Sequence, residues 1–169
     1  MANSKDLLVA WLNDAYAMEQ GLIPVLQNHA NDMKDNPQAQ QRLQQHIEET
    51  RRHGERIQQC VQRLGTTTST AKSALATVLG SIQSVSTGMF GDEKVKNALA
   101  DYSAEQFEVA AYRALIAAAR EHGDQEIVRA CEDNLREDEA MARWLDQQLP
   151  SIVRMTTEKQ AAGARGARA

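Results

Sequence analysis

Aromatic residues, glycine, proline and cysteine are all scarce in this chain of 169 residues. Aromatics make up 4% of it, and there are 9 glycines, 3 prolines and 2 cysteines. Strands are typically rich in aromatic and β-branched residues and are joined by glycine- and proline-rich turns, so the composition does not support an all-β fold. The commonest residues are Ala, Gln, Glu, Leu and Arg, which favour an all-α protein.

The two cysteines, Cys60 and Cys131, lie far apart and form no CxxC pair. This spacing indicates neither a thiolate zinc site nor a disulfide framework. Both are therefore predicted to be buried, reduced thiols.

No apolar run approaches the roughly 18 residues needed to cross a membrane. The opening "MANSKDLLVAWL" also lacks a basic region followed by an uninterrupted apolar core and a cleavage site. These absences predict a cytoplasmic protein with no membrane partner.

No segment is strongly basic, and the net charge of −4 is that of an ordinary soluble surface. The final stretch "EKQAAGARGARA" has few arginines and no apolar periodicity. Residues 156–169 are predicted to be a disordered tail, and not an arm that binds nucleic acid, because so few arginines give little affinity for phosphate.

Apolar residues recur at steps of three and four over four long segments, which predicts four helices. Their expected bounds are Asn3 or Ser4 to about His29, Pro37 to Leu64, Asp92 to His122, and about Asp124 to Gln148, with the last helix ending before Pro150. A Thr-, Ser- and Gly-rich connection, residues 66–91, joins the second helix to the third and is expected to contain one short helix near Ala71 to Ser84. Residues 1–155 are therefore predicted to form one four-helix bundle with a long crossover.

Polar side chains interrupt the apolar stripe of each predicted helix near its middle. Steps of three and four place them at Glu19 in the first helix; at His46, Glu49 or Thr50, and His53 in the second; at Glu105 and Glu108 in the third; and at Asn134 and Glu137 or Asp138 in the fourth. Glu48 and Glu55 fall off the second stripe and are expected to be solvated. Each helix therefore carries at least one inward carboxylate.

The inward carboxylates of each hairpin also share one level. Glu19 and Glu49 lie on opposite sides of the first loop, each about 12 residues or about 18 Å away from it. Glu108 and Glu137 lie at matching distances from the turn at Gly123. Carboxylates gathered in a core repel one another unless a cation neutralises them, and a carboxylate-rich bundle core is the known arrangement for two iron or manganese ions.

Each polar residue, taken alone, has an ordinary alternative. Glu19 or Glu137 can be a partly exposed residue of an alanine-rich helix, His53 can lie at the edge of the bundle, and Glu105 can pair with Arg52 or Arg56. The coincidence across four helices favours the metal site.

Four motifs, "DAYAMEQ" (14–20), "HIEETRRH" (46–53), "EQFEVAAYRALIAAAREHGD" (105–124) and "LREDEAMARWLDQQLP" (135–150), resemble the YciE/YciF family of bacterial ferritin-like stress proteins. The similarity is closest to the YciE branch and covers most of residues 5–155. It implies a ferritin-like, rubrerythrin-related bundle that is usually dimeric and induced by osmotic, oxidative or stationary-phase stress.

The resemblance also implies a dinuclear iron or manganese centre and no organic cofactor. The ligands it suggests are Glu19, His46, Glu49, Glu105, Glu108 and Glu137. The wider ferritin-like pattern has a histidine three residues after a glutamate, but Arg52 follows Glu49 and Ala140 follows Glu137 at that spacing. A carboxylate-rich, asymmetric centre is therefore expected, and His53, one position from the usual spacing, is left outside the set.

Three functions remain open on the sequence. The first is a stress-response oxidoreductase, ferroxidase- or peroxidase-like, that handles Fe(II) with oxygen or peroxide. Tyr102 or Tyr112 would be a radical or hydrogen-bond partner, although core packing with a bonded hydroxyl is the more ordinary role for both. The second is a non-enzymatic dimeric bundle whose metal site is vestigial or absent. The third is iron storage in a larger assembly, for which no sequence feature demands a cage.

Overall fold

The computed structural model describes residues 4–69 and 92–166, with side chains as far as residue 163. It contains four long helices in these ranges: α1 (Ser4–Asp32), α2 (Pro37–Arg63), α4 (Glu93–His122) and α5 (Gln125–Gly166). The short helix expected near Ala71 to Ser84 lies outside the described residues. The all-α prediction is confirmed.

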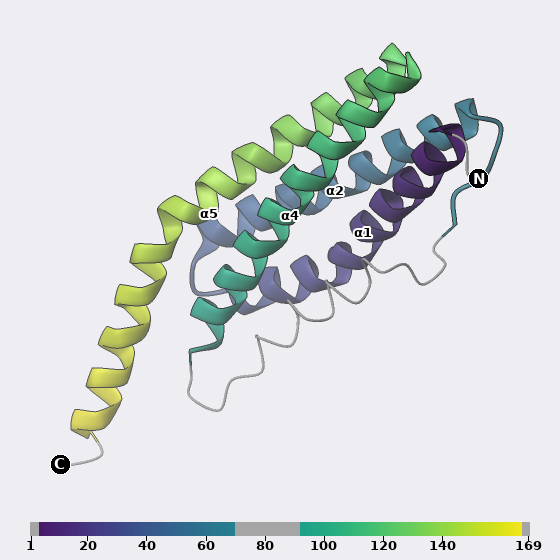
Figure 1. Ribbon diagram of the computed structural model, residues 1–169. Helices are drawn as coiled ribbons and strands as arrows, with labels where there is room; N and C mark the ends of the chain where they lie inside the picture. The colour runs from purple at the N-terminus through teal and green to yellow at the C-terminus, as the bar shows by residue number, and fades with distance from the viewer. Residues whose placement is uncertain (1–3, 70–91, 167–169) are drawn as a thin grey trace.

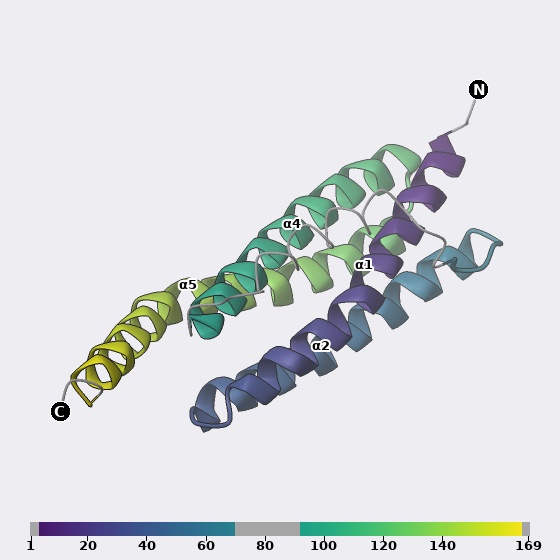
Figure 2. The ribbon, with the colours of Figure 1, turned by 90° about the horizontal axis from the view of Figure 1, so that it is seen from below.

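The helices form two antiparallel hairpins, α1 with α2 and α4 with α5, that pack against each other (Figure 1). Helix α1 also packs against α4, and α2 against α5, so the four helices enclose one core. Figure 2 shows the two hairpins from below, and both extend along the length of the bundle. Helix α2 ends and α4 begins at opposite ends of the bundle (Figure 1), as the predicted crossover requires.

The helix ends follow the predicted local signals. The side chain of Asn36 accepts a hydrogen bond from the backbone N–H of Ala39 at 3.2 Å, and Pro37 occupies the first turn of α2, where no N–H is needed. Gly123 ends α4 in the left-handed conformation, with a φ of 82°. Asp124 then caps α5 by accepting hydrogen bonds from the N–H groups of Glu126 and Ile127.

The end of the fourth helix differs from the sequence prediction. Helix α5 does not stop before Pro150 but continues to Gly166, so residues 156–166, expected to be disordered, are helical. Proline removes one helical hydrogen bond, yet Ile152 beyond it is buried in the core cluster that also contains Met33. This burial offsets the lost bond, and the last turns of α5 project beyond the other helices (Figure 1). The boundary of the domain at residue 155 stays a prediction.

None of the helices within the described residues combines the length and the hydrophobicity needed to span a bilayer. Cys60 and Cys131 are both buried free thiols, as predicted.

We expect Gly123→Ala to destabilise the protein by about 1 kcal/mol, because alanine is strained at a φ of 82°. Urea unfolding followed by circular dichroism measures the change. Gly163→Ala is the matched control, since Gly163 lies within helix α5 with nothing within 4 Å of an added Cβ. An equal loss of stability in both variants would contradict the assignment of Gly123 as the cap of α4.

Candidate metal centre

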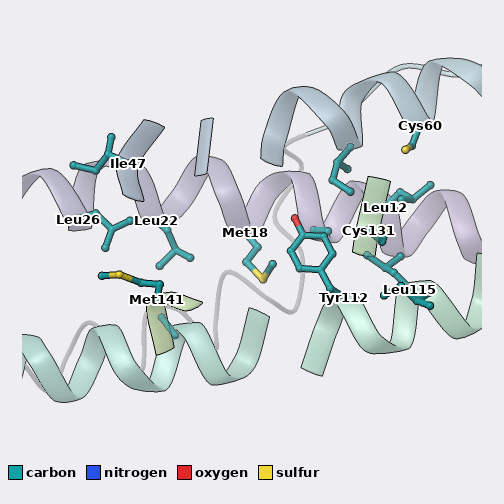
Figure 3. Close-up of a cluster of buried hydrophobic side chains, with 14 of the residues drawn as sticks. Leu12, Met18, Leu22, Leu26, Ile47, Cys60, Tyr112, Leu115, Cys131 and Met141 are labelled. Carbon is teal, nitrogen blue, oxygen red and sulfur yellow. The ribbon is translucent and has the colours of Figure 1, made fainter. Parts of the chain in front are cut away.

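A layer of polar side chains crosses the middle of the core, between two apolar regions. In Figure 3, Leu22, Leu26, Ile47 and Met141 lie on one side of Met18 and Tyr112, and Leu12, Leu115 and the two cysteines on the other. The polar layer comes from all four helices and consists of Glu19, His46, Thr50, His53, Glu105, Glu108, Asn134 and Asp138, all almost completely buried. Burial of so many ionisable groups is costly unless they are paired or bound to something.

Two groups of side chains within this layer have the geometry to hold a metal ion. His46, Glu105, Glu108 and Asp138 form the first group, and Glu19, His53 and Asp138 form the second. Within each group, one ligand atom from each residue lies within 4.8 Å of the others. Asp138 belongs to both, so its carboxylate lies between two candidate metal positions.

The structure brings four of the six sequence-predicted ligands into these groups, namely Glu19, His46, Glu105 and Glu108. Glu49 and Glu137 belong to neither group, and their assignment as ligands stays a prediction. Two residues of the groups, His53 and Asp138, were outside the predicted set.

The strict heptad spacing of α5 is the signal that would have selected Asp138. Its most deeply buried residues, Ile127, Cys131, Asn134, Asp138, Met141 and Leu145, alternate steps of four and three, a pattern that keeps one helix face inward. The same alternation on α2 passes through His46, Thr50 and His53 and misses Glu49. In each helix the predicted glutamate precedes the inward position by one residue.

Glu49 and Glu137 instead contact the two histidines from outside the groups. Glu49 Oε2 lies 3.0 Å from His46 Nδ1 and also accepts a hydrogen bond from Arg42. Glu137 Oε2 lies 2.8 Å from His53 Nε2, and Arg56 pairs with the same carboxylate. The side chain of Glu137 is 30% exposed, whereas that of Asp138 is fully buried.

The histidine of the first group is held in its charged form. Burial alone would lower the pKa of His46, but the Glu105 carboxylate, 2.7 Å from Nε2, and the hydrogen bond to Glu49 raise it to about 10. The pKa of Glu49 is shifted downwards. Burial alone would raise it, but His46 and Arg42 lower it to about 2. His46 therefore carries a positive charge that partly balances the carboxylates around it.

The pKa values of three inner carboxyl groups are raised, whereas that of Glu49 is lowered. Burial, followed by the charges of Glu19 and Asp138, raises the pKa of Glu108 well above its usual value. Burial, followed by the charges of Glu19 and Glu105, does the same to the pKa of Asp138. Burial also raises the pKa of Glu105, although His46 opposes it. Without a cation, burial and mutual repulsion therefore disfavour the charged forms of these three carboxyl groups.

Tyr112 links Glu19 on α1 to Asn134 on α5 through two hydrogen bonds. Its buried hydroxyl donates a hydrogen bond to Glu19 Oε1 and accepts one from Asn134 Nδ2 at 2.9 Å. Burial and the neighbouring Glu19 charge raise the pKa of Tyr112 well above its usual value, so the phenol stays protonated. Tyr112 thus positions Glu19, and Tyr102 lies only half-buried on another part of α4.

We expect Tyr112→Phe to destabilise the metal-free protein by about 1–3 kcal/mol, because Glu19 and Asn134 each lose a buried partner. Chemical unfolding in the presence of a chelator measures this loss. Tyr102→Phe removes a hydroxyl from a half-buried ring outside the layer and is the matched control. A Tyr112→Phe variant as stable as the control would show that the hydroxyl does not hold Glu19.

A four-helix bundle with a crossover, whose four helices each contribute carboxylate or histidine side chains to one level of the core, is a ferritin-like fold. Bacterioferritin from Desulfovibrio desulfuricans has the same fold, with a TM-score of 0.66 and 18% identity over 96% of this chain and 91% of that one. The solved structures of that bacterioferritin show its diiron site in different catalytic states.

The chain belongs to the DUF892 family, a domain of unknown function, whose model matches residues 3–158. A crystallised protein from Xanthomonas campestris is 34% identical, covers 95% of this chain and 99% of its own, and has a TM-score of 0.81. The stress protein YciF of Escherichia coli has a TM-score of 0.77 and 22% identity, with coverage of 91% and 99%. The resemblance to the YciE/YciF family is confirmed.

Proposed function

We propose that the polar layer binds two divalent metal ions, iron or manganese, one in each group with Asp138 shared between them. The observation that carries this proposal is a set of buried polar atoms without hydrogen-bond partners. Among the described residues, all but one of these atoms belong to the two groups: Glu19 Oε2, His53 Nδ1, Glu105 Oε2, Glu108 Oε2 and both oxygens of Asp138. Atoms of this kind are costly in a folded protein, and cations would satisfy them.

The donor set suits the proposed metals. Carboxylates with one histidine in each group favour iron or manganese over metals that prefer thiolates, and neither cysteine belongs to the groups. Two cations would also neutralise the four inner carboxylates, Glu19, Glu105, Glu108 and Asp138. Without them, the charge of Glu19 helps to raise the pKa values of the other three.

Bound iron would supply the change of redox state that reduction of oxygen or peroxide requires. The residues of the chain hold the ligands in place: Tyr112 orients Glu19, while Glu49 and Glu137 orient the two histidines. Similarity to a bacterial stress protein supports a role in the stress response, with Fe(II) as the substrate and oxygen or peroxide as the oxidant. A cytoplasmic homodimer completes this proposal, and light scattering on the purified protein tests the dimer.

A non-enzymatic bundle is the second candidate, and the ion pairs of the histidines favour it. His46 is paired with Glu49 and Glu105, and His53 with Glu137, so part of the layer is neutralised without any cation. In such a protein the polar layer would only fix how the helices pair.

Metal analysis of reconstituted protein separates the two candidates. The chain is stripped with a chelator, incubated without oxygen with Fe(II) or Mn(II), desalted and analysed by plasma mass spectrometry. We expect about two ions per chain, as a dinuclear carboxylate centre requires, and a rapid rise of ferric absorbance when the iron form meets air. Retention of negligible metal of either kind would refute the metal centre and leave the non-enzymatic bundle.

A further inference from the structure

The two cysteines lie opposite each other across the interface of α2 and α5. His53 Nδ1 on α2 lies 3.4 Å from Asp138 Oδ1 on α5. Cys60 follows His53 by seven residues, and Cys131 precedes Asp138 by seven. Seven residues are close to two helical turns, so each cysteine lies on the same face of its helix as the residue in the ion pair.

The direction of the helices places both cysteines at the same level. Because α2 and α5 are antiparallel, seven residues forward on one and seven back on the other lead the same way along the bundle. Contacts on both sides of this level confirm the register. Arg56 donates to Asn134 Oδ1 at 2.8 Å on one side, and Arg63 lies 3.5 Å from Asp124 on the other.

The surroundings of the two thiols are apolar and closed. Cys60 is 3% exposed, Cys131 is fully buried, and both belong to the hydrophobic core cluster, where Figure 3 shows them beyond Tyr112. Burial raises the pKa of Cys60 to about 11, and burial followed by the charge on Cys60 raises the pKa of Cys131. The influence of one thiol on the other agrees with the proximity that the helix register gives.

We propose that Cys60 and Cys131 are an oxidisable thiol pair that closes to an intramolecular disulfide when the chain is exposed to hydrogen peroxide. This inference does not depend on the metal centre. The facing positions supply the geometry, and peroxide is small enough to enter a core that excludes larger oxidants.

The chemistry balances with peroxide as the only co-reactant. The sulfur of one cysteine attacks a peroxide oxygen, the O–O bond breaks, and a sulfenic acid and one water result. The second sulfur then attacks the sulfenic sulfur, the S–S bond forms, and a second water leaves with the remaining proton. Two thiols thereby give two electrons to one peroxide, and since little thiolate is present at neutral pH, the reaction is slower than that of an activated cysteine.

The disulfide would join the α1–α2 hairpin to the α4–α5 hairpin by a covalent bond. It closes a loop of roughly 70 residues, and for a chain of this size the loss of unfolded-state entropy corresponds to a rise in Tm of about 10 °C. Oxidation would therefore lock the two halves of the bundle together two helical turns from the polar layer.

The experiment treats the metal-free full-length chain with hydrogen peroxide, removes the excess with catalase, and alkylates the protein in denaturant with and without a reductant. Since the chain has only two cysteines, any intramolecular disulfide must be this one. We expect an intact mass lower by about 2 Da, the mass of the two hydrogens removed, no alkylation until reductant is added, and a higher Tm that the reductant reverses.

The variants Cys60→Ser and Cys131→Ser are expected to show neither the mass loss nor the reversible rise in Tm. The wild-type measurement stands on its own if a variant fails to fold. Three results would overturn the proposal: thiols that stay open to alkylation while methionines are oxidised, a stable sulfenic or sulfonic acid on one cysteine, or disulfide-linked dimers on a non-reducing gel.

Discussion

Asp138→Asn is expected to reduce the metal content of the reconstituted protein from about two ions per chain, the number that a dinuclear bundle site holds, to nearly none. The substitution removes the carboxylate shared by both groups and preserves the shape of the side chain. Asparagine is neutral, so it also relieves the repulsion with Glu19 and Glu105, the charges that raise the pKa of Asp138. We therefore expect the metal-free variant to be at least as stable as the wild type.

Loss of metal without loss of stability distinguishes a ligand from a structural residue. The measurements are metal content by plasma mass spectrometry and Tm with and without Mn(II), which should rise in the wild type but not in Asp138→Asn. Glu137→Gln is the comparison variant, because Glu137 is the adjacent carboxylate and lies outside both groups. Glutamine keeps an amide oxygen that can accept the hydrogen bond from His53, so this variant is expected to retain most of the metal. If Glu137→Gln loses the metal and Asp138→Asn keeps it, the sequence prediction is right for this helix and our assignment from the structure is wrong.

The second large effect is a difference in sign between two pH dependences, that of the stability of the metal-free protein and that of the stabilisation by bound metal. In the metal-free form, Glu105, Glu108 and Asp138 have raised pKa values. Their folded forms hold protons that the unfolded chain releases above about pH 4.5. Their contribution to stability is therefore present at low pH and lost as the pH rises through the folded pKa values.

Two histidines, His46 and His29, also stabilise the metal-free protein more at low pH than at high pH. The pKa of His46 is raised to about 10. That of His29 is raised too: burial alone would lower it, but Asp101, 2.6 Å away, outweighs the burial. Each contributes stability that is complete below its unfolded pKa of about 6.5 and is lost as the pH rises through its folded value. Glu49 and Glu137 have lowered pKa values, so their contribution is lost only as the pH falls below that of an ordinary carboxyl group.

The Tm of the metal-free protein should therefore be highest near pH 5 and fall towards pH 9. Metal binding requires deprotonated ligands, so the rise in Tm caused by Mn(II) should grow over the same range. Thermal unfolding at a series of pH values, with chelator or with Mn(II), gives both curves. A metal-free protein that becomes more stable from pH 5 to pH 9 would contradict the raised carboxyl pKa values.

The sequence by itself determined the four helices, their caps at Asn36 and Gly123, and the presence of polar side chains at one level. These features depend on local signals: steps of three and four, a capping side chain, and a glycine in the left-handed conformation. They also sufficed to identify Glu19, His46, Glu105 and Glu108 as inward residues, since apolar neighbours one turn away fix the face of the helix.

Steps of three and four left open which residue of each adjacent pair faces the core, Glu49 or Thr50, and Glu137 or Asp138. The heptad spacing favours Thr50 and Asp138, and the tertiary structure decided the choice. Neighbouring residues differ by about 100° around a helix, so a small rotation of α2 or α5 exchanges them, and packing against the other helices sets that rotation. Packing likewise explains why α5 continues past Pro150, because Ile152 beyond the proline is buried in the same core cluster as Met33, a residue distant in sequence. The antiparallel register that sets Cys60 opposite Cys131 is also tertiary, since it joins residues that no local pattern connects.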